Sequence, residues 1–168
     1  ALSPLDLGLN MNLGDFLIFA RRFDEATRHL EHTLDMAPGF VPGRLRLAEA
    51  LALAGHHDMA LAQAEIAFAE APSLPRVRET RALVLAIAGR RDEARQELAA
   101  LAEERSGRYV SAWEIARVHA VMADTDEAMH WLNEAIAERA PMTLFAGIHA
   151  TLDPVRDDKR FPTILRSI

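Results

Sequence analysis

The sequence predicts an all-α fold made of stacked helix pairs, and three observations support this prediction. An Asp-Glu-Ala motif recurs in similar form along the chain with a 34-residue period, which places its alanines at Ala26, Ala60, Ala94 and Ala128. A fixed period of about 20–50 residues is typical of proteins that stack one structural unit several times. Alanine and leucine, which are strong helix formers, dominate the composition. No segment combines period-two alternation with the β-branched residues of a strand.

Each period has room for two helices joined by a tight turn. The four periods span residues 7–40, 41–74, 75–108 and 109–142. The first helix is expected from about Pro4 to Ala20, where Phe16, Leu17 and Ala20 have the helical spacing of buried positions.

Residues 1–6 precede the first period. Pro4, Pro38 and Pro72 follow one another at the same 34-residue period. We therefore interpret residues 1–6 as the tail of an earlier repeat. The alternative is an ordinary N-terminus, with Ser3 as a helix cap and Pro4 at the first helical position.

The second helix of each period is expected to begin with acidic residues. Asp24, Asp58, Asp92 and Asp126 occupy equivalent positions, where the positive end of the helix dipole favours a negative charge. Because they recur at one structural position, a helix-start role is favoured over a role as catalytic carboxylates.

Small and capping residues mark the helix ends and contacts. Gly55 and Gly89 lie between the helices of their periods, where a residue with positive φ ends the first helix. The periodic alanines are expected at close helix contacts, which a larger side chain would overpack. Ser111 and Glu114 have the spacing of a capping box at the start of a helix.

The period stops after Pro141, and residues 143–168 are expected to cap the array. A short helix fits the stretch from Met142 to His149. Phe161, Ile164 and Leu165 are expected to cover the last helix pair, because an uncapped repeat leaves an apolar face open to water.

This pattern resembles the tetratricopeptide (TPR) repeat, a helix, a tight turn, a second helix and a closing proline. The matching residues are Leu13, Gly14, Phe23, Ala26, Leu30 and Pro38, then Leu47, Ala48, Gly55, Ala60, Ala67 and Pro72, then Ala82, Gly89, Ala94 and Leu98, then Ile115, Ala116, Ala128, Leu132 and Ala135. The family's early tryptophan is absent, Ser106 stands at a proline position, and Ala123 stands where glycine is common. The resemblance implies a right-handed solenoid of four repeats.

The C-terminal part of the chain, from Tyr109 onward, also resembles TPR arrays of bacterial signalling proteins. Pro154, Arg156, Asp158, Arg160 and Phe161 match a string that precedes a final leucine pair in those proteins. The resemblance implies that the array belongs to a larger regulator with a DNA-binding, cyclase or kinase domain. We expect a cytoplasmic location.

The resemblance also implies a partner-binding groove on the concave face, formed by the first helix of each pair. The implied groove residues are Met11, Asp15, Ile18 and Phe19, then Leu45, Glu49 and Leu53, then Arg76, Glu79, Leu83 and Ile87, then Trp113, Arg117 and Val121. Trp113 is the first candidate contact, because aromatic residues lead among binding hot spots. Burial of Trp113 between helices is the alternative.

Composition limits the classes of ligand. The net charge of −6 argues against nucleic acid, which needs a basic face, and the chain has no cysteine for disulfides or thiolate metal sites. No apolar run approaches the roughly 20 residues of a membrane span. His29 and His32 have helical spacing for one metal, but the sequence anchors no third ligand, so we expect neither metal nor cofactor.

The sequence thus predicts a non-catalytic scaffold that binds a protein segment, with an amphipathic helix in a groove as the natural mode. Two alternatives stay open: self-association of the parent protein, and a small-molecule sensor with a pocket between helices. An enzyme is the least favoured class, because no nucleophile or acid–base pair stands in a recognisable context.

Overall fold

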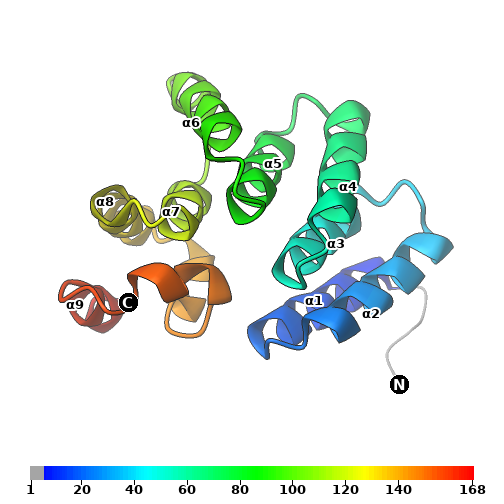
Figure 1. Ribbon diagram of the computed structural model, residues 1–168, viewed down its shortest axis with the longest axis horizontal. Helices are drawn as coiled ribbons and strands as arrows, with labels where there is room; N and C mark the ends of the chain where they lie inside the picture. Colours follow the sequence, from blue (N-terminus) through cyan, green and yellow to red (C-terminus); the bar gives the residue numbers. More distant parts are fainter. Residues whose placement is uncertain (1–5) are drawn as a thin grey trace.

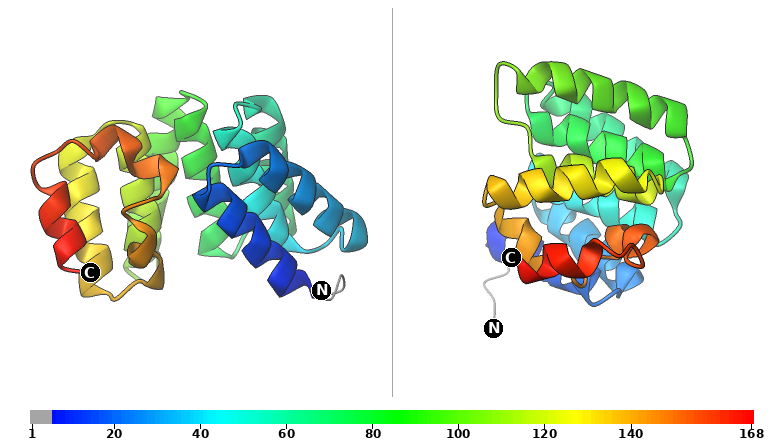
Figure 2. Two further views of the ribbon diagram at one scale, coloured as in Figure 1. Left: turned by 90° about the horizontal axis from the view of Figure 1, so that it is seen from below. Right: turned by 90° about the vertical axis from the view of Figure 1, so that its left-hand side faces the viewer.

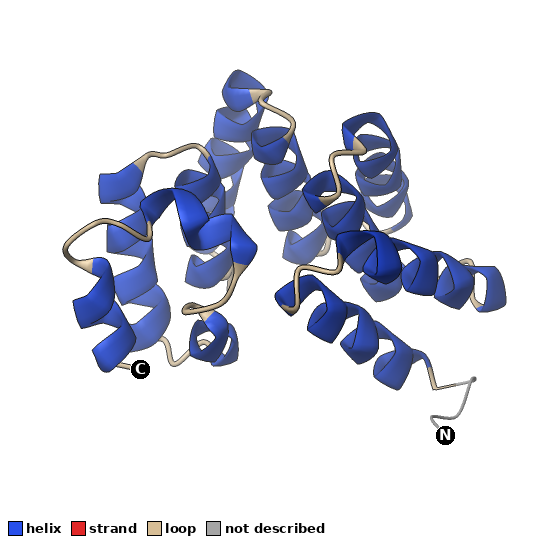
Figure 3. Ribbon diagram, turned by 60° about the horizontal axis from the view of Figure 1, so that its bottom comes forward, coloured by secondary structure: helices blue, strands red, loops and turns tan. Residues whose placement is uncertain are grey.

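The computed structural model describes residues 6–168, which form α-helices, short 3-10 helices and loops without strands (Figures 1 and 3). In chain order the elements are α1 (Leu7–Phe19), α2 (Phe23–Met36), α3 (Val41–Leu53), α4 (His57–Glu70), α5 (Pro75–Ile87), α6 (Arg91–Arg105), α7 (Ala112–Val121), α8 (Thr125–Ala137), η1 (Pro141–Phe145), η2 (Ala150–Val155) and α9 (Phe161–Arg166). The predicted all-α class is confirmed. The prediction for residues 1–6 lies outside the described residues except at Asp6, whose carboxylate accepts the Leu9 N–H and caps α1.

The helices follow the 34-residue period of the sequence. α2, α4, α6 and α8 begin at residues 23, 57, 91 and 125, and α1, α3 and α5 begin at 7, 41 and 75. α7 begins at Ala112, slightly later than its place in that series. Each odd-numbered helix packs against the even-numbered helix that follows it, and each pair packs against the next.

The turn inside every pair contains a left-handed residue. Arg21, Gly55, Gly89 and Ala123 have φ angles of 60°, 86°, 76° and 56°. The N–H of the following residue bonds to the carbonyl five positions earlier, which closes the preceding helix. The predicted positive φ at Gly55 and Gly89 is confirmed. Arginine and alanine adopt this conformation at a steric cost of about 1–2 kcal/mol.

Small residues let the helices of a pair approach closely. Ala26, Ala60, Ala94 and Ala128 are fully buried. Gly14 shows how close the helices lie, because a Cβ atom there would stand 2.7 Å from a methyl carbon of Leu30. Larger side chains at these points would force the helices apart.

The outer flank of α1 is apolar and exposed. Phe16 is 63% exposed, whereas Ala50, Val84 and Val118, which occupy the same position in later pairs, are fully buried. That position faces the preceding helix, and no described helix precedes α1. The prediction that Phe16 and Ala20 are buried is therefore wrong.

The helix pairs form an arc, with α1, α3, α5 and α7 on its inner side and the even-numbered helices on its outer side (Figure 1). The chain then turns back, and its orange and red part lies beside the yellow helices of the last pair (Figure 2). We call residues 141–155 the C-terminal segment; they include η1, η2 and the residues between them. This segment carries the chain to the inner side of the arc, where Phe145 contacts the end of α1.

The cap agrees with the prediction in part. A short helix forms near Met142, the 3-10 helix η1, but it ends at Phe145, before His149. Phe161 and Ile164 are buried against the last pair as predicted, but Leu165 is 37% exposed. Among residues 6–168, none of the helices is both long and apolar enough to cross a membrane.

Candidate functional site

The C-terminal segment is anchored on α7 and the last hydrophobic core. Leu152 and Val155 are buried in the same cluster as Trp113. The Arg117 Nε atom donates a hydrogen bond of 3.1 Å to the Thr151 hydroxyl. This side of the segment is therefore part of the core.

The opposite side of the segment meets the end of α1. The rings of Phe19 and Phe145 stack with their centroids 4.5 Å apart, and the His149 ring lies 5.5 Å from Phe19. Beyond α1, the Arg21 guanidinium donates two hydrogen bonds, of 2.6 and 2.8 Å, to the Asp153 carboxylate. We call these contacts the seam, because they join the first helix of the arc to its C-terminal part.

A charged network lies on the inner face between the helices. It contains four carboxylates and three guanidiniums, from Asp15, Glu49, Glu79, Glu114, Arg46, Arg76 and Arg117. The helices α1, α3, α5 and α7 each contribute one or more of these residues. The network therefore links every helix pair of the array.

Arg117 stands at the centre of this network and is fully buried. It binds Glu49 through Nη2 and Glu114 through Nη1, the latter at 2.7 Å. His149 Nε2 lies 3.7 Å from Glu49 Oε1, and its Nδ1 lies 3.0 Å from the Thr151 hydroxyl. The C-terminal segment thus completes the surroundings of Arg117.

The network sets the protonation of its members. Burial alone would raise the pKa of Glu49, but the nearby Arg117 and Arg46 guanidiniums outweigh burial and lower that pKa to about 2. At Glu114 burial also acts to raise the pKa, but the Arg117 and Arg76 guanidiniums outweigh burial and lower it. Burial, reinforced by the Arg117 charge, lowers the pKa of His149 to about 3, so its imidazole is neutral.

Two acids at the edge of the network behave in the opposite way. Burial raises the pKa of Asp15, although Arg46 partly opposes it. Burial and the neighbouring Glu114 carboxylate raise the pKa of Glu79. At these two acids burial therefore outweighs the nearby guanidiniums, whereas at Glu49 and Glu114 the guanidiniums outweigh burial.

An open hollow with mainly apolar walls remains beside the network. Its volume is about 330 Å³. It is lined by Met11, Val41, Pro42, Leu45, Arg46, Leu74, Arg76 and Met142. We call this hollow the trough. A second hollow of about 350 Å³ shares Arg76 with it and is lined also by Pro75, Glu79, Tyr109 and Ser111.

The predicted groove residues fall into three groups. Met11, Leu45 and Arg76 line the trough. Asp15, Glu49, Arg76, Glu79 and Arg117 belong to the charged network. Ile18, Phe19, Leu53, Leu83, Ile87, Trp113 and Val121 pack in the core or at the seam.

Several of these residues are therefore not accessible contacts. Trp113, the first candidate contact, is 1% exposed and packs against His149 of the C-terminal segment. The other buried members of the predicted groove are Ile18, Leu45, Glu49, Glu79, Leu83 and Arg117. The prediction of an accessible surface at these positions is wrong, because the inner side chains pack on neighbouring helices and on the returning chain.

Sequence reasoning missed the residues that the C-terminal segment contributes. Phe145, His149, Thr151 and Asp153 lie outside the 34-residue period, so no periodic position assigns them to the inner face. The predicted capping box of Ser111 and Glu114 is wrong: the Ser111 side chain makes no capping hydrogen bond, and Glu114 pairs with Arg76 and Arg117. A glutamate at a helical position that faces the core could have indicated a buried ion pair.

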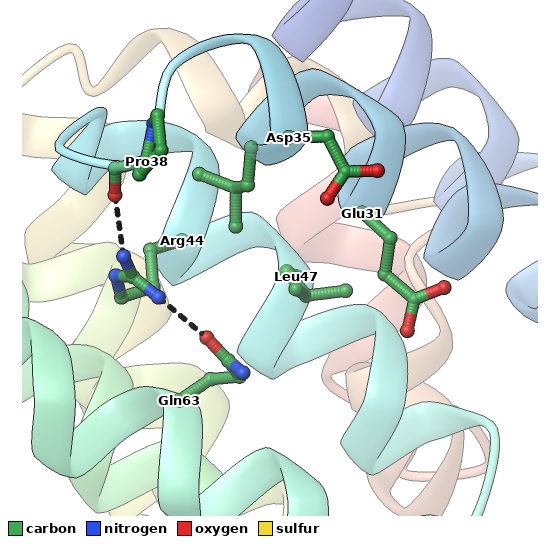
Figure 4. Close-up of a pocket in the computed structure, with 7 residues that line it drawn as sticks. Glu31, Asp35, Pro38, Arg44, Leu47 and Gln63 are labelled. Atoms are coloured by element: carbon green, nitrogen blue, oxygen red, sulfur yellow. Dashed lines mark hydrogen bonds between the residues drawn. The ribbon is translucent and has the colours of Figure 1, made fainter.

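A more polar hollow lies on the other side of α3 (Figure 4). Arg44 crosses it and donates hydrogen bonds to the Pro38 carbonyl and the Gln63 side chain. Arg78, one period later, donates in a similar way to Glu97 and Glu104. This recurrence indicates a structural tie between the two helices of a pair.

The two histidines considered as metal ligands differ in their contacts. His29 Nε2 donates to the Asn10 carbonyl at 2.8 Å, whereas His32 is exposed. In the described part of the chain, no group of three His, Cys, Asp or Glu side chains is arranged to hold a metal ion.

Comparison with known proteins adds no assignment. No protein-family model matches this chain, and no curated protein is significantly similar to it in sequence.

Proposed function

We propose that the chain is a non-catalytic scaffold of the tetratricopeptide type, a right-handed solenoid that binds a segment of another protein. The support is the regular 34-residue period of the helices, with a left-handed residue in the turn of each pair. The implied context is a larger bacterial regulator in the cytoplasm. The C-terminal part that carries this resemblance folds back onto the array.

The trough is the observation that carries the binding proposal. Its exposed walls are mainly apolar, and Leu74 on its rim is 49% exposed. Exposed apolar hollows rimmed by polar groups are typical of interaction sites. Arg46 and Arg76 also line the trough, where they orient polar groups of the bound segment.

The charged network supports a binding role over a catalytic one. Each guanidinium in it is already paired with a carboxylate. The neutral His149 is held between Thr151 and Glu49. A general base needs access to a substrate proton, and the buried members of this network offer none.

Peptide selection tests the proposal even though the partner is unidentified. A displayed library of random peptides is selected on the full chain, and enriched peptides are measured by fluorescence anisotropy. We expect apolar peptides whose affinity falls at least tenfold in Leu74→Glu. The matched control is Ile66→Glu, at an exposed aliphatic residue of α4 outside the trough, which should leave binding unchanged. No enrichment, or equal losses in both variants, would refute the trough as the site.

Self-association is the second candidate, and the exposed Phe16 flank of α1 favours it. Light scattering across a dilution series should then show a mass that rises with concentration in the wild type and stays constant in Phe16→Glu.

A small-molecule sensor is the third candidate, and the size of the trough favours it, since ligand pockets have about 300–1,000 Å³. Native mass spectrometry of the freshly purified chain should then reveal a bound metabolite, which Leu74→Glu should lose.

A further inference from the structure

The C-terminal segment has two very different attachments. Toward α7 it is held by buried contacts, including the Arg117–Thr151 hydrogen bond and the packing of Leu152 and Val155. Toward α1 it is held by the seam, in which the Arg21–Asp153 pair is exposed to solvent. The weaker attachment is therefore the one to α1.

The magnitudes of the seam contacts show that they are individually small. An exposed ion pair changes an equilibrium by less than about fivefold. A stacked aromatic pair such as Phe19 and Phe145 contributes about two- to tenfold beyond its buried area. Apart from the apolar area that the Phe19, Phe145 and His149 rings bury, these contacts favour the closed arrangement only weakly.

Arg21 also has no evident role in the fold of its own turn. It occupies the left-handed position that glycine fills in the second and third pairs, where a side chain is sterically disfavoured. Its guanidinium instead reaches across the seam to a residue 132 positions away in sequence. The bidentate pairing with Asp153 is the interaction that an arginine adds here.

We propose that the seam opens when a partner segment replaces the C-terminal segment on α1, presenting an aromatic ring to Phe19 and a carboxylate to Arg21. This inference rests on the proposed scaffold function and names the partner chemistry for the end of α1. The chain's own segment defines that chemistry, because Phe145 supplies the ring and Asp153 the carboxylate. In the open state, the Arg21 cation and the Phe19 ring are free to receive such a partner.

A peptide copied from the chain tests the proposal directly. The probe is a fluorescent peptide of residues 144–154, which contains both Phe145 and Asp153. Because the internal segment competes for α1, the apparent affinity is reduced in proportion to the fraction of chains that are open. We expect about tenfold tighter binding to the full-length Phe145→Ala/Asp153→Ala chain than to the wild type.

Two matched controls identify the surface that the peptide binds. The full-length Phe19→Ala/Arg21→Ala chain should not bind the peptide, because α1 lacks its recognition groups. A peptide with alanine in place of Phe145 and Asp153 should bind neither variant. The milder Asp153→Asn substitution, at an exposed side chain, should give a smaller gain on its own, and it keeps the test decisive if the double variant is unstable.

Opening can also be measured as a distance. The chain has no cysteine, so spin labels at Asn12→Cys on α1 and Ile148→Cys on the C-terminal segment, both exposed, report the separation of the two sides of the seam. We expect a longer distance to appear when the probe peptide is added. One unchanged distance, together with no peptide binding to any variant, would overturn the proposal. Trough-selected peptides would still bind in that case, which separates this failure from a failure of the scaffold function.

Discussion

The charged network makes one strong prediction, which concerns Arg117. Replacing Arg117 with methionine removes the guanidinium that pairs with Glu49 and Glu114 but keeps a long, unbranched side chain. Both carboxylates are buried. Without Arg117, Glu49 keeps an ion pair with Arg46 and Glu114 keeps one with Arg76. Breaking a buried ion pair from one side costs about 3–5 kcal/mol. Since domains have a total stability of about 5–15 kcal/mol, Arg117→Met should lose a large fraction of the free energy of unfolding.

Urea denaturation followed by far-ultraviolet circular dichroism measures this loss. The matched control is Arg22→Met, which removes an exposed arginine paired with Glu25. This control should leave the urea midpoint nearly unchanged, because solvent screens an exposed ion pair. Adding Glu49→Gln to Arg117→Met should restore part of the loss, because it removes one of the two buried carboxylates that have lost Arg117 as a partner. If Arg117→Met and Arg22→Met have equally small effects, the network is not desolvated and the reasoning fails.

Three further predictions concern acid stability, packing and backbone strain. Because the folded-state pKa of Glu49 is about 2 and its ordinary value is 4.5, its ionised form stabilises the fold above about pH 4.5. That contribution, about 3 kcal/mol at about 1.4 kcal/mol per pKa unit, is lost as the pH falls toward 2. As the pH is lowered, the urea midpoint should therefore fall less in Glu49→Gln than in the wild type. The same fall in both proteins would contradict the lowered pKa of Glu49. Ala94→Leu should lower the free energy of unfolding by about 1–3 kcal/mol through overpacking, and unchanged urea stability would remove the evidence for a tight contact there. Ala123→Gly should raise the melting temperature, because glycine adopts the left-handed conformation without the cost of about 1–2 kcal/mol that a side chain adds. Gly89→Ala should lower the melting temperature for the same reason. Equal melting temperatures in the wild type and both variants would argue against left-handed turns.

The periodic part of the fold could be predicted because each pair repeats the same local rules. Alanine at tight contacts and glycine after the first helix follow the 34-residue period, as at Ala60 and Gly55. Each recurrence strengthens the others, so helix positions follow from the sequence even where one repeat departs from the pattern. Ala123, for example, adopts the left-handed φ that glycine adopts elsewhere.

The site was less predictable because it depends on a segment that obeys no period. His149 and Thr151 reach Arg117 and Glu49 only after the chain has turned back at η1, and local sequence does not encode that direction. The resemblance identified which residues lie on the inner side of the helices. It could not predict whether solvent or another segment of the chain covers them. Trp113 is the clearest case, since His149, which packs against its ring, lies beyond the whole of α8 in the chain.

The contact between Arg21 and Asp153 has a consequence for how the molecule folds and melts. In a linear array each unit touches only its neighbours, so the terminal units fray first and unfolding spreads inward. Here the first pair is held from both sides, and amides in α1 should exchange with solvent more slowly than those of a free end. The same contact joins residues 132 positions apart, so it should form only after the helix pairs between them have folded and brought the two ends together. Folding should therefore end with the step in which the two ends meet.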